Sequence, residues 1–173
     1  LASRMRKGAT WNDAFRHIIR RCFLLVCFGV GLHWVYSGKP VWELWNVLTQ
    51  LSFTILLTFL VLGWNWKKQL AVALGCLLLT ELLYRGYAPE SPFIKDQNFG
   101  SWFDLLLMGK INNGGGWVTI NFLPTAAHTI FGAICGQLLR TDKAAADKLK
   151  WLLLGGVTCL LAGYALDLGG ITP

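Results

Sequence analysis

Charged residues are scarce in this sequence. Only 14% of its 173 residues are charged, 16 Lys and Arg against 9 Asp and Glu, whereas 54% are hydrophobic. So few charges cannot cover the surface of a soluble domain of this length. The five cysteines are odd in number and lie in apolar runs, which excludes a secreted disulfide scaffold. The composition therefore indicates a membrane protein.

Motifs of well-known soluble enzyme classes are also lacking. The chain has no GxSxG motif, no P-loop and no dinucleotide fingerprint. No Cys or His spacing suggests zinc, and of the three histidines only His33 and His128 lie where two imidazoles could meet around a haem. A lone membrane His more often bonds to a neighbouring helix, so we expect neither metal nor haem. The net charge of +7 comes without any RNA- or DNA-binding motif, so we expect no nucleic-acid partner.

Long apolar runs fill most of the chain. A spanning helix needs about 20 apolar residues, and five windows come near this length, at 18–36, 47–64, 69–84, 119–139 and 149–166. We predict an all-α, polytopic transmembrane helical bundle that forms a single domain over 1–173, with a long loop at 85–118. In that loop the apolar run from Trp102 to Met108 predicts a short helix that carries Asp104.

The basic residues sort along the chain in a way that predicts its orientation. Twelve Lys and Arg lie before the first span and in the 65–68 and 140–150 connections, and four lie in the alternate ones. The positive-inside rule then places the amino end in the cytoplasm and the 85–118 loop outside. Among the basic residues, Arg20 and Arg21 fall at headgroup depth. They either anchor this end to anionic lipid or bind phosphate at a cytosolic pocket.

Polar residues within the spans mark two further places. In the second span they recur every four residues, which predicts one polar face that serves either interhelical hydrogen bonds or a substrate path: Asn46, Gln50, Thr54 and Thr58. Near the outer end of the fourth span they surround a proline, where we expect a kink: Asn121, Pro124, Thr125 and His128. Glu81 and Arg85 have ion-pair spacing. Small residues at Gly132, Gly136, Gly155, Cys159 and Gly163 predict close helix packing.

Four stretches, in this order and at these separations, resemble the bacterial relatives of heparan-alpha-glucosaminide N-acetyltransferase. They are 20–29 (RRCFLLVCFG), 46–51 (NVLTQL), 102–109 (WFDLLLMG) and 119–125 (TINFLPT), the last followed by Gly132 and Gly136. The resemblance covers nearly the whole chain. It implies a polytopic enzyme that takes an acyl group from cytosolic acyl-CoA, such as acetyl-CoA, and delivers it to a sugar amine or hydroxyl on the other side of the membrane.

The resemblance also suggests roles for individual residues. Gln50, Asn121, Thr125 and His128 become candidates to line the substrate pocket, with Asp104 orienting the outer loop and Arg20 and Arg21 contacting the CoA phosphates. The catalytic Asn and His of the family belong to elements that would precede Leu1, so neither role passes to His33 or His128. We therefore expect an interior piece of a longer protein of a bacterial inner membrane, catalytically silent alone, whose partners are the lipid bilayer and the rest of the polypeptide. A homodimer is left open.

One departure from the family weakens the inference about its acceptor. The animal enzymes carry a Gln-Arg pair where this chain has Thr49 and Gln50. The rival interpretation is a membrane protein without enzymatic activity, either a small-solute transporter or a structural subunit. Inverted repeats and broken helices would favour transport, and only the Pro124 region suggests a broken helix.

Overall fold

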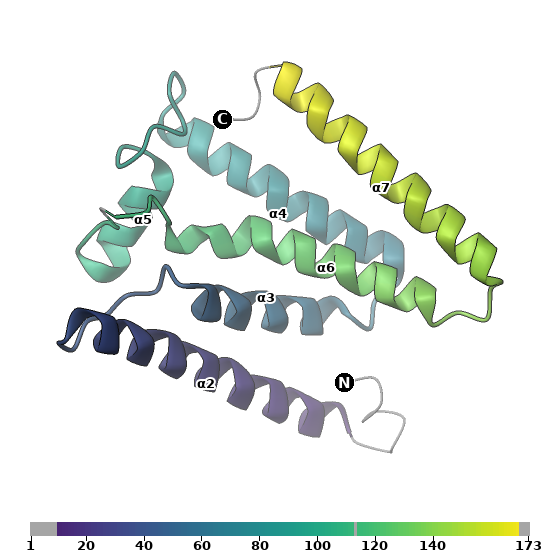
Figure 1. Cartoon of the computed structure of the whole chain (residues 1–173), viewed down its shortest axis with the longest axis horizontal. Coiled ribbons are helices and arrows are strands. Elements are labelled where there is room, and N and C mark those ends of the chain that lie inside the picture. Colours follow the sequence, from purple (N-terminus) through teal and green to yellow (C-terminus); the bar gives the residue numbers. More distant parts are fainter. Residues whose placement is uncertain (1–9, 113, 170–173) are drawn as a thin grey trace. The chain divides into compact units, whose positions relative to one another are not determined.

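The computed structural model of the chain describes residues 10–112 and 114–169 (Figure 1). Within these residues six α-helices and one 3₁₀ turn follow one another without any strand, so the all-α prediction is confirmed. The elements are α2 (Trp11–Ser37), α3 (Val47–Val61), α4 (Trp66–Tyr87), α5 (Phe99–Met108), η1 (Thr119–Asn121), α6 (Phe122–Leu139) and α7 (Ala145–Leu168).

Four of the helical segments are long and apolar enough to cross a membrane: α2, α4, η1 with α6, and α7. They contain the predicted spans at 18–36, 69–84, 119–139 and 149–166. The predicted span at 47–64 corresponds to α3, which has only 15 residues. Fifteen residues rise about 22 Å, short of the roughly 30 Å hydrocarbon core. Asn46 caps the beginning of α3, and Gln69 Nε2 donates to the Leu62 and Trp64 carbonyls just beyond its end.

The chain divides into two compact units, the first ending at Phe131 and the second beginning at Gly132. The expectation of a single transmembrane domain stays a prediction. In the first unit, α2 begins with a capping box, because Asp13 N–H donates to Thr10 Oγ1 at 3.2 Å and Thr10 N–H donates back to Asp13 Oδ2 at 3.3 Å. These reciprocal bonds satisfy backbone donors that a helix start leaves open.

The helices α2 and α3 lie side by side over a core of Ala14, Ile18, Cys22 and Phe59. The Cys22 thiol donates to the Ser52 carbonyl at 3.2 Å. Further along α2, a Cβ on Gly29 would lie 2.5 Å from Asn46 Oδ1. Gly29 therefore lets the start of α3 approach the α2 backbone closely.

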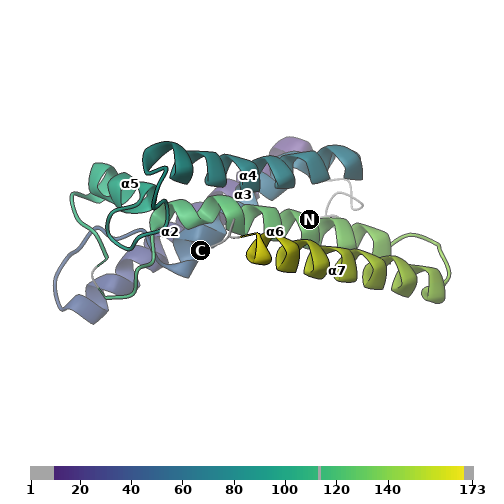
Figure 2. The same ribbon diagram turned by 90° about the horizontal axis from the view of Figure 1, so that it is seen from above.

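A second core joins α4, α5 and the chain before α6. It consists of Tyr84, Val118 and Ile120, with aromatic rings of α5 and its flanks around them. Gly100 lies close against this core, since a Cβ there would collide with Tyr84 Oη and lie 2.7 Å from Val118 Cγ2. Figure 2 shows α5 beside the C-terminal end of α4. The predicted helix at Trp102–Met108 is thus confirmed as part of α5.

The connection 38–46 and the segment after α5 meet at one end of this unit. Leu44 N–H donates to the Met108 thioether at 3.2 Å. Lys110 Nζ lies 2.7 Å from Glu43 Oε1. Residues more than sixty positions apart are therefore brought together where α2 ends and α3 begins, and they build the site described below.

The second unit contains the end of α6 and α7, none of whose residues is buried. Apart from adjacent residues and the helix's own nearby backbone, no heavy atom of the described residues lies within 4 Å of a Cβ placed on Gly132, Gly136, Gly155 or Gly163. Within this unit, the close packing predicted at these glycines is therefore not formed.

Two local predictions have different outcomes. The Glu81–Arg85 ion pair is confirmed. The kink predicted at Pro124 is not required, because Pro124 is the third residue of α6. In the first turn of a helix, a missing N–H removes no intrahelical hydrogen bond.

Candidate functional site

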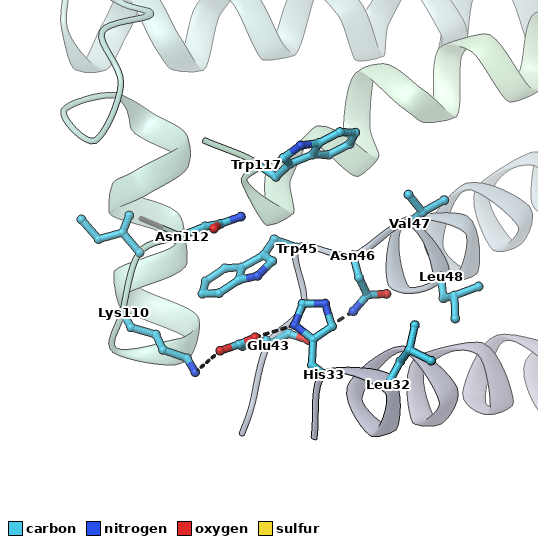
Figure 3. A pocket seen from close by; sticks show the side chains of 11 residues that line it. Leu32, His33, Glu43, Trp45, Asn46, Val47, Leu48, Lys110, Asn112 and Trp117 are labelled. Carbon is cyan, nitrogen blue, oxygen red and sulfur yellow. Dashed lines mark hydrogen bonds and ion pairs between the residues drawn. The ribbon is translucent and has the colours of Figure 1, made fainter. Parts of the chain in front are cut away.

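A pocket of about 650 Å³ lies between the end of α2, the start of α3 and the segment after α5 (Figure 3). Its lining is a mixture of polar side chains, two tryptophans and aliphatic residues: Leu32, His33, Glu43, Trp45, Asn46, Val47, Leu48, Lys110, Ile111, Asn112 and Trp117. The volume falls within the range of small-molecule sites.

The local sequence explains how the 38–46 wall is held. Gly38 adopts a left-handed conformation, φ 65°, and ends α2. Asn46 then begins α3, its Oδ1 accepting from Thr49 N–H at 3.0 Å while its Nδ2 donates to the Glu43 carbonyl at 3.3 Å. This one amide both caps the helix and fixes the backbone of Glu43, so the Glu43 side chain enters the pocket from a defined position.

Glu43 is the centre of a charged network in the pocket. Its Oε1 accepts from Lys110 Nζ at 2.7 Å, and its Oε2 is hydrogen-bonded to His33 Nδ1. Figure 3 shows the three side chains in a row, linked through the carboxylate. Burial by itself would raise the pKa of Glu43, but the hydrogen bonds and charges of His33 and Lys110 outweigh it and hold this pKa below its ordinary value. Glu43 is therefore a carboxylate at neutral pH.

Two tryptophans give the pocket its aromatic surface. Trp45 is 8% exposed, and the Lys110 ammonium lies 5.7 Å from the centre of its ring, within the range of a cation–π contact. Trp117 is 51% exposed. Beside them, Asn112 Oδ1 accepts from the backbone N–H groups of Gly114 and Gly115 at 3.2 and 3.3 Å, which shapes the segment before Trp117.

Asp104, predicted to orient the loop, lies outside the pocket and ties α5 to η1. It is fully buried, and its Oδ1 accepts from Thr119 N–H at 3.0 Å. Burial raises the pKa of Asp104, and hydrogen bonding from Thr119 offsets part of this effect. Its Oδ2 and the Thr119 hydroxyl are both buried without a hydrogen-bond partner among the described residues. The side chain thus positions the segment that leads from the pocket into α6.

The other residues predicted from the sequence do not line this pocket. Gln50 lies one turn beyond Asn46 on the buried face of α3, and its Nε2 has no partner among the described residues. Asn121 and Thr125 bond to each other, the Thr125 hydroxyl donating to the Asn121 carbonyl at 2.7 Å. His128 is exposed, with Nδ1 3.0 Å from the Pro124 carbonyl oxygen.

The predicted polar face of α3 is largely buried, as expected, since Gln50 and Thr54 are 5% and 0% exposed. Thr54 donates to the Leu51 carbonyl of its own helix, and the Thr58 hydroxyl has no partner in the described part of the chain.

Arg20 and Arg21 are exposed on α2, far from the pocket. Thirteen residues separate Arg20 from His33, which corresponds to about 20 Å along the helix. Arg20 and Arg21, the predicted phosphate contacts, therefore lie at a different level along α2 from His33, which lines the pocket.

Sequence reasoning missed Glu43 and Lys110. The run Trp42-Glu43-Leu44-Trp45-Asn46, a carboxylate among aromatic and amide residues between two apolar helices, was the available signal. Nothing in the sequence indicated that Lys110 would reach Glu43, because their meeting depends on the fold.

The lining is chemically suited to a small polar molecule with an apolar face. Among residues 10–112 and 114–169, no group of three His, Cys, Asp or Glu side chains could hold a metal ion. The pocket instead combines indole rings with amide, ammonium, imidazole and carboxylate groups. No protein-family model, curated protein or solved structure matches the chain.

Proposed function

We propose that the chain is part of a membrane acyltransferase of a bacterial inner membrane, which moves an acyl group from cytosolic acyl-CoA to a sugar amine or hydroxyl on the outer side. The observation that carries this proposal is the pocket around Glu43. This pocket supports an acceptor site, because it lies at the end of the helices that the charge distribution predicts to be outside.

The lining suits a sugar better than it suits an apolar solute. A sugar ring presents C–H groups on its faces and hydroxyls around its edge. Trp45 and Trp117 offer indole surfaces for the faces, and Lys110 and Asn112 offer hydrogen-bonding groups for the edge. A pocket for a hydrocarbon chain would leave those polar groups without partners, which is costly.

The donor would bind at the opposite side of the membrane. Arg20 and Arg21 are exposed and lie in the most basic region of the first span, so they support an interaction with the CoA phosphates. An acyltransferase of this kind needs an acyl-CoA site on one side of the membrane and an acceptor site on the other. A transporter needs no acyl-CoA site.

The acceptor site can be tested by sugar binding to the chain in detergent. Trp117→Ala should weaken binding of methyl β-glucoside about tenfold or more, because a loss of about 1.4 kcal/mol of contact is tenfold in affinity. Trp64→Ala is the matched control: Trp64 is also 51% exposed but lies between α3 and α4. Equal affinities for the two variants would contradict the assignment of the pocket.

The donor site is tested separately with acetyl-CoA. Arg20→Ala together with Arg21→Ala should weaken acetyl-CoA binding and reduce its salt dependence, because two phosphate contacts are removed. Lys67→Ala with Lys68→Ala, an exposed basic pair on the same predicted side, serves as control. Unchanged acetyl-CoA affinity in the arginine variant would refute the phosphate contacts, and sugar binding without any acetyl-CoA binding would favour a transporter.

A further inference from the structure

The charged groups of the pocket bear on which acceptor it would bind, a sugar hydroxyl or a sugar amine. Glu43 is the one carboxylate among the residues that line it, all of which lie in the described part of the chain. Both of its oxygens are already engaged, Oε1 by Lys110 and Oε2 by His33. A protonated amine entering the pocket would therefore find no carboxylate without a cation of its own.

The groups that remain for a ligand are chiefly donors. Lys110 uses one N–H on Glu43 and keeps two. Asn112 Oδ1 is occupied by two backbone N–H groups, so its Nδ2 is the atom left to bind. Asn46 is occupied at both ends, its Oδ1 by Thr49 and its Nδ2 by Glu43. A pocket of this kind matches oxygen atoms that accept hydrogen bonds and repels an ammonium, which only donates.

We propose that the pocket selects a sugar hydroxyl as the acyl acceptor and discriminates against a protonated amino sugar. This inference rests on the proposed function and names the acceptor class of the same site. In the transfer, the sugar oxygen forms a bond to the acyl carbon, the thioester C–S bond breaks, and the hydroxyl proton ends on the CoA thiol. Lys110 sets the preference, because its ammonium both neutralises Glu43 and faces the ligand.

The test compares methyl β-glucoside with methyl β-glucosaminide, binding to the full chain at about pH 7, where an amine of this kind is still mostly protonated. We expect the glucoside to bind about tenfold or more tightly than the glucosaminide, because like charges brought together in a binding site are strongly unfavourable. Lys110→Met frees Glu43 Oε1 for the ligand, so it should raise the affinity for the glucosaminide and reduce or reverse the preference.

Two further variants make the test independent of folding defects. Lys39→Met removes an exposed lysine from the same connection as Glu43 but outside the pocket, and should leave the preference unchanged. Glu43→Gln leaves Lys110 without its carboxylate, and should weaken the glucosaminide further relative to the glucoside.

Each outcome has a distinct meaning. If the glucosaminide binds the unsubstituted chain as tightly as the glucoside or more so, the proposed preference is wrong while the acceptor site stands. A preference that survives Lys110→Met unchanged would also overturn the inference. If neither sugar binds, the acceptor site itself is refuted and the inference fails with it.

Discussion

At Gly29, α2 approaches the start of α3 closely. A Cβ on Gly29 would lie 2.5 Å from Asn46 Oδ1, and Asn46 both caps α3 and holds Glu43. Because Asn46 lines the pocket, the absence of a side chain at Gly29 affects the pocket indirectly. A residue with a Cβ at this position would displace the amide that organises the 38–46 connection.

We predict that Gly29→Ala destabilises the chain by about 1–3 kcal/mol, because it overpacks a close contact and disturbs a helix cap. Gly31→Ala, in the same helix with open space around its Cβ, should be neutral or slightly stabilising, since alanine favours helix. Thermal unfolding in detergent, followed by tryptophan fluorescence, measures both. Equal effects of the two substitutions would show that the Gly29 contact does not matter.

Glu43 makes stability dependent on pH. The pKa of Glu43 is lowered in the folded chain from an ordinary value of 4.5, so its ionised form contributes stability above that pH. We predict that the unsubstituted chain is more stable than Glu43→Gln near neutral pH, and that this advantage disappears as the pH falls below 4.5. Unfolding midpoints measured across pH test this prediction. Glu90→Gln, at an exposed loop position, serves as the control variant.

At the scale of elements, α5 places the segment that follows it, which carries Lys110, against the 38–46 connection. Asp104 holds it to η1 through the Thr119 N–H, and Gly100 lets it lie against Val118. Because Lys110 follows α5 almost immediately, the position of α5 decides whether Lys110 reaches Glu43. The pocket therefore depends on an element that does not itself line it.

We predict that Asp104→Asn is tolerated and Asp104→Ala is not. Asparagine keeps an acceptor for Thr119 N–H, whereas alanine leaves a buried N–H unsatisfied at a cost of about 1–3 kcal/mol. The measurement is the unfolding midpoint, with the exposed Asp142→Asn as control. Equal stability of the alanine and asparagine variants would rule out this role for the hydrogen bond.

The same carboxyl group has the opposite pH dependence to Glu43. Its folded pKa is raised above the ordinary 3.8, so the contribution of its protonated form is present below that pH and is lost as the pH rises through the folded value. We predict that the stability of Asp104→Asn relative to the unsubstituted chain increases as the pH rises above 3.8. A difference that stays constant with pH would contradict it.

At the scale of the whole molecule, the charge distribution makes a prediction about orientation. With the five native cysteines replaced, Glu90→Cys should react with a membrane-impermeant maleimide in intact cells, and Asp142→Cys only after permeabilisation, because the basic connections remain in the cytoplasm. Both positions are exposed, so accessibility within the chain does not limit labelling. Labelling of Asp142→Cys in intact cells would reverse the proposed orientation.

The sequence by itself determined the helices. Apolar runs predict five spans, four of which correspond to helices long and apolar enough to cross a membrane, because this signal depends on neighbours a few residues apart. Thr10 followed by Asp13 marks the start of α2 by the same kind of local signal. The short helix around Asp104 and the Glu81–Arg85 pair follow from the same local rules. The sequence overestimated the length of α3, because the apolar run continues past Val61, the residue at which the helix ends.

Only the tertiary structure decided which polar residues share a site. Gln50, Asn121, Thr125 and His128 looked suitable from their depth and spacing, yet none lines the pocket. Glu43 and Lys110 are 67 positions apart and meet because α5 folds back onto the 38–46 connection. Periodicity reports which face of a helix a residue occupies, whereas a contact across loops depends on how several packed elements end together, and no local pattern encodes that.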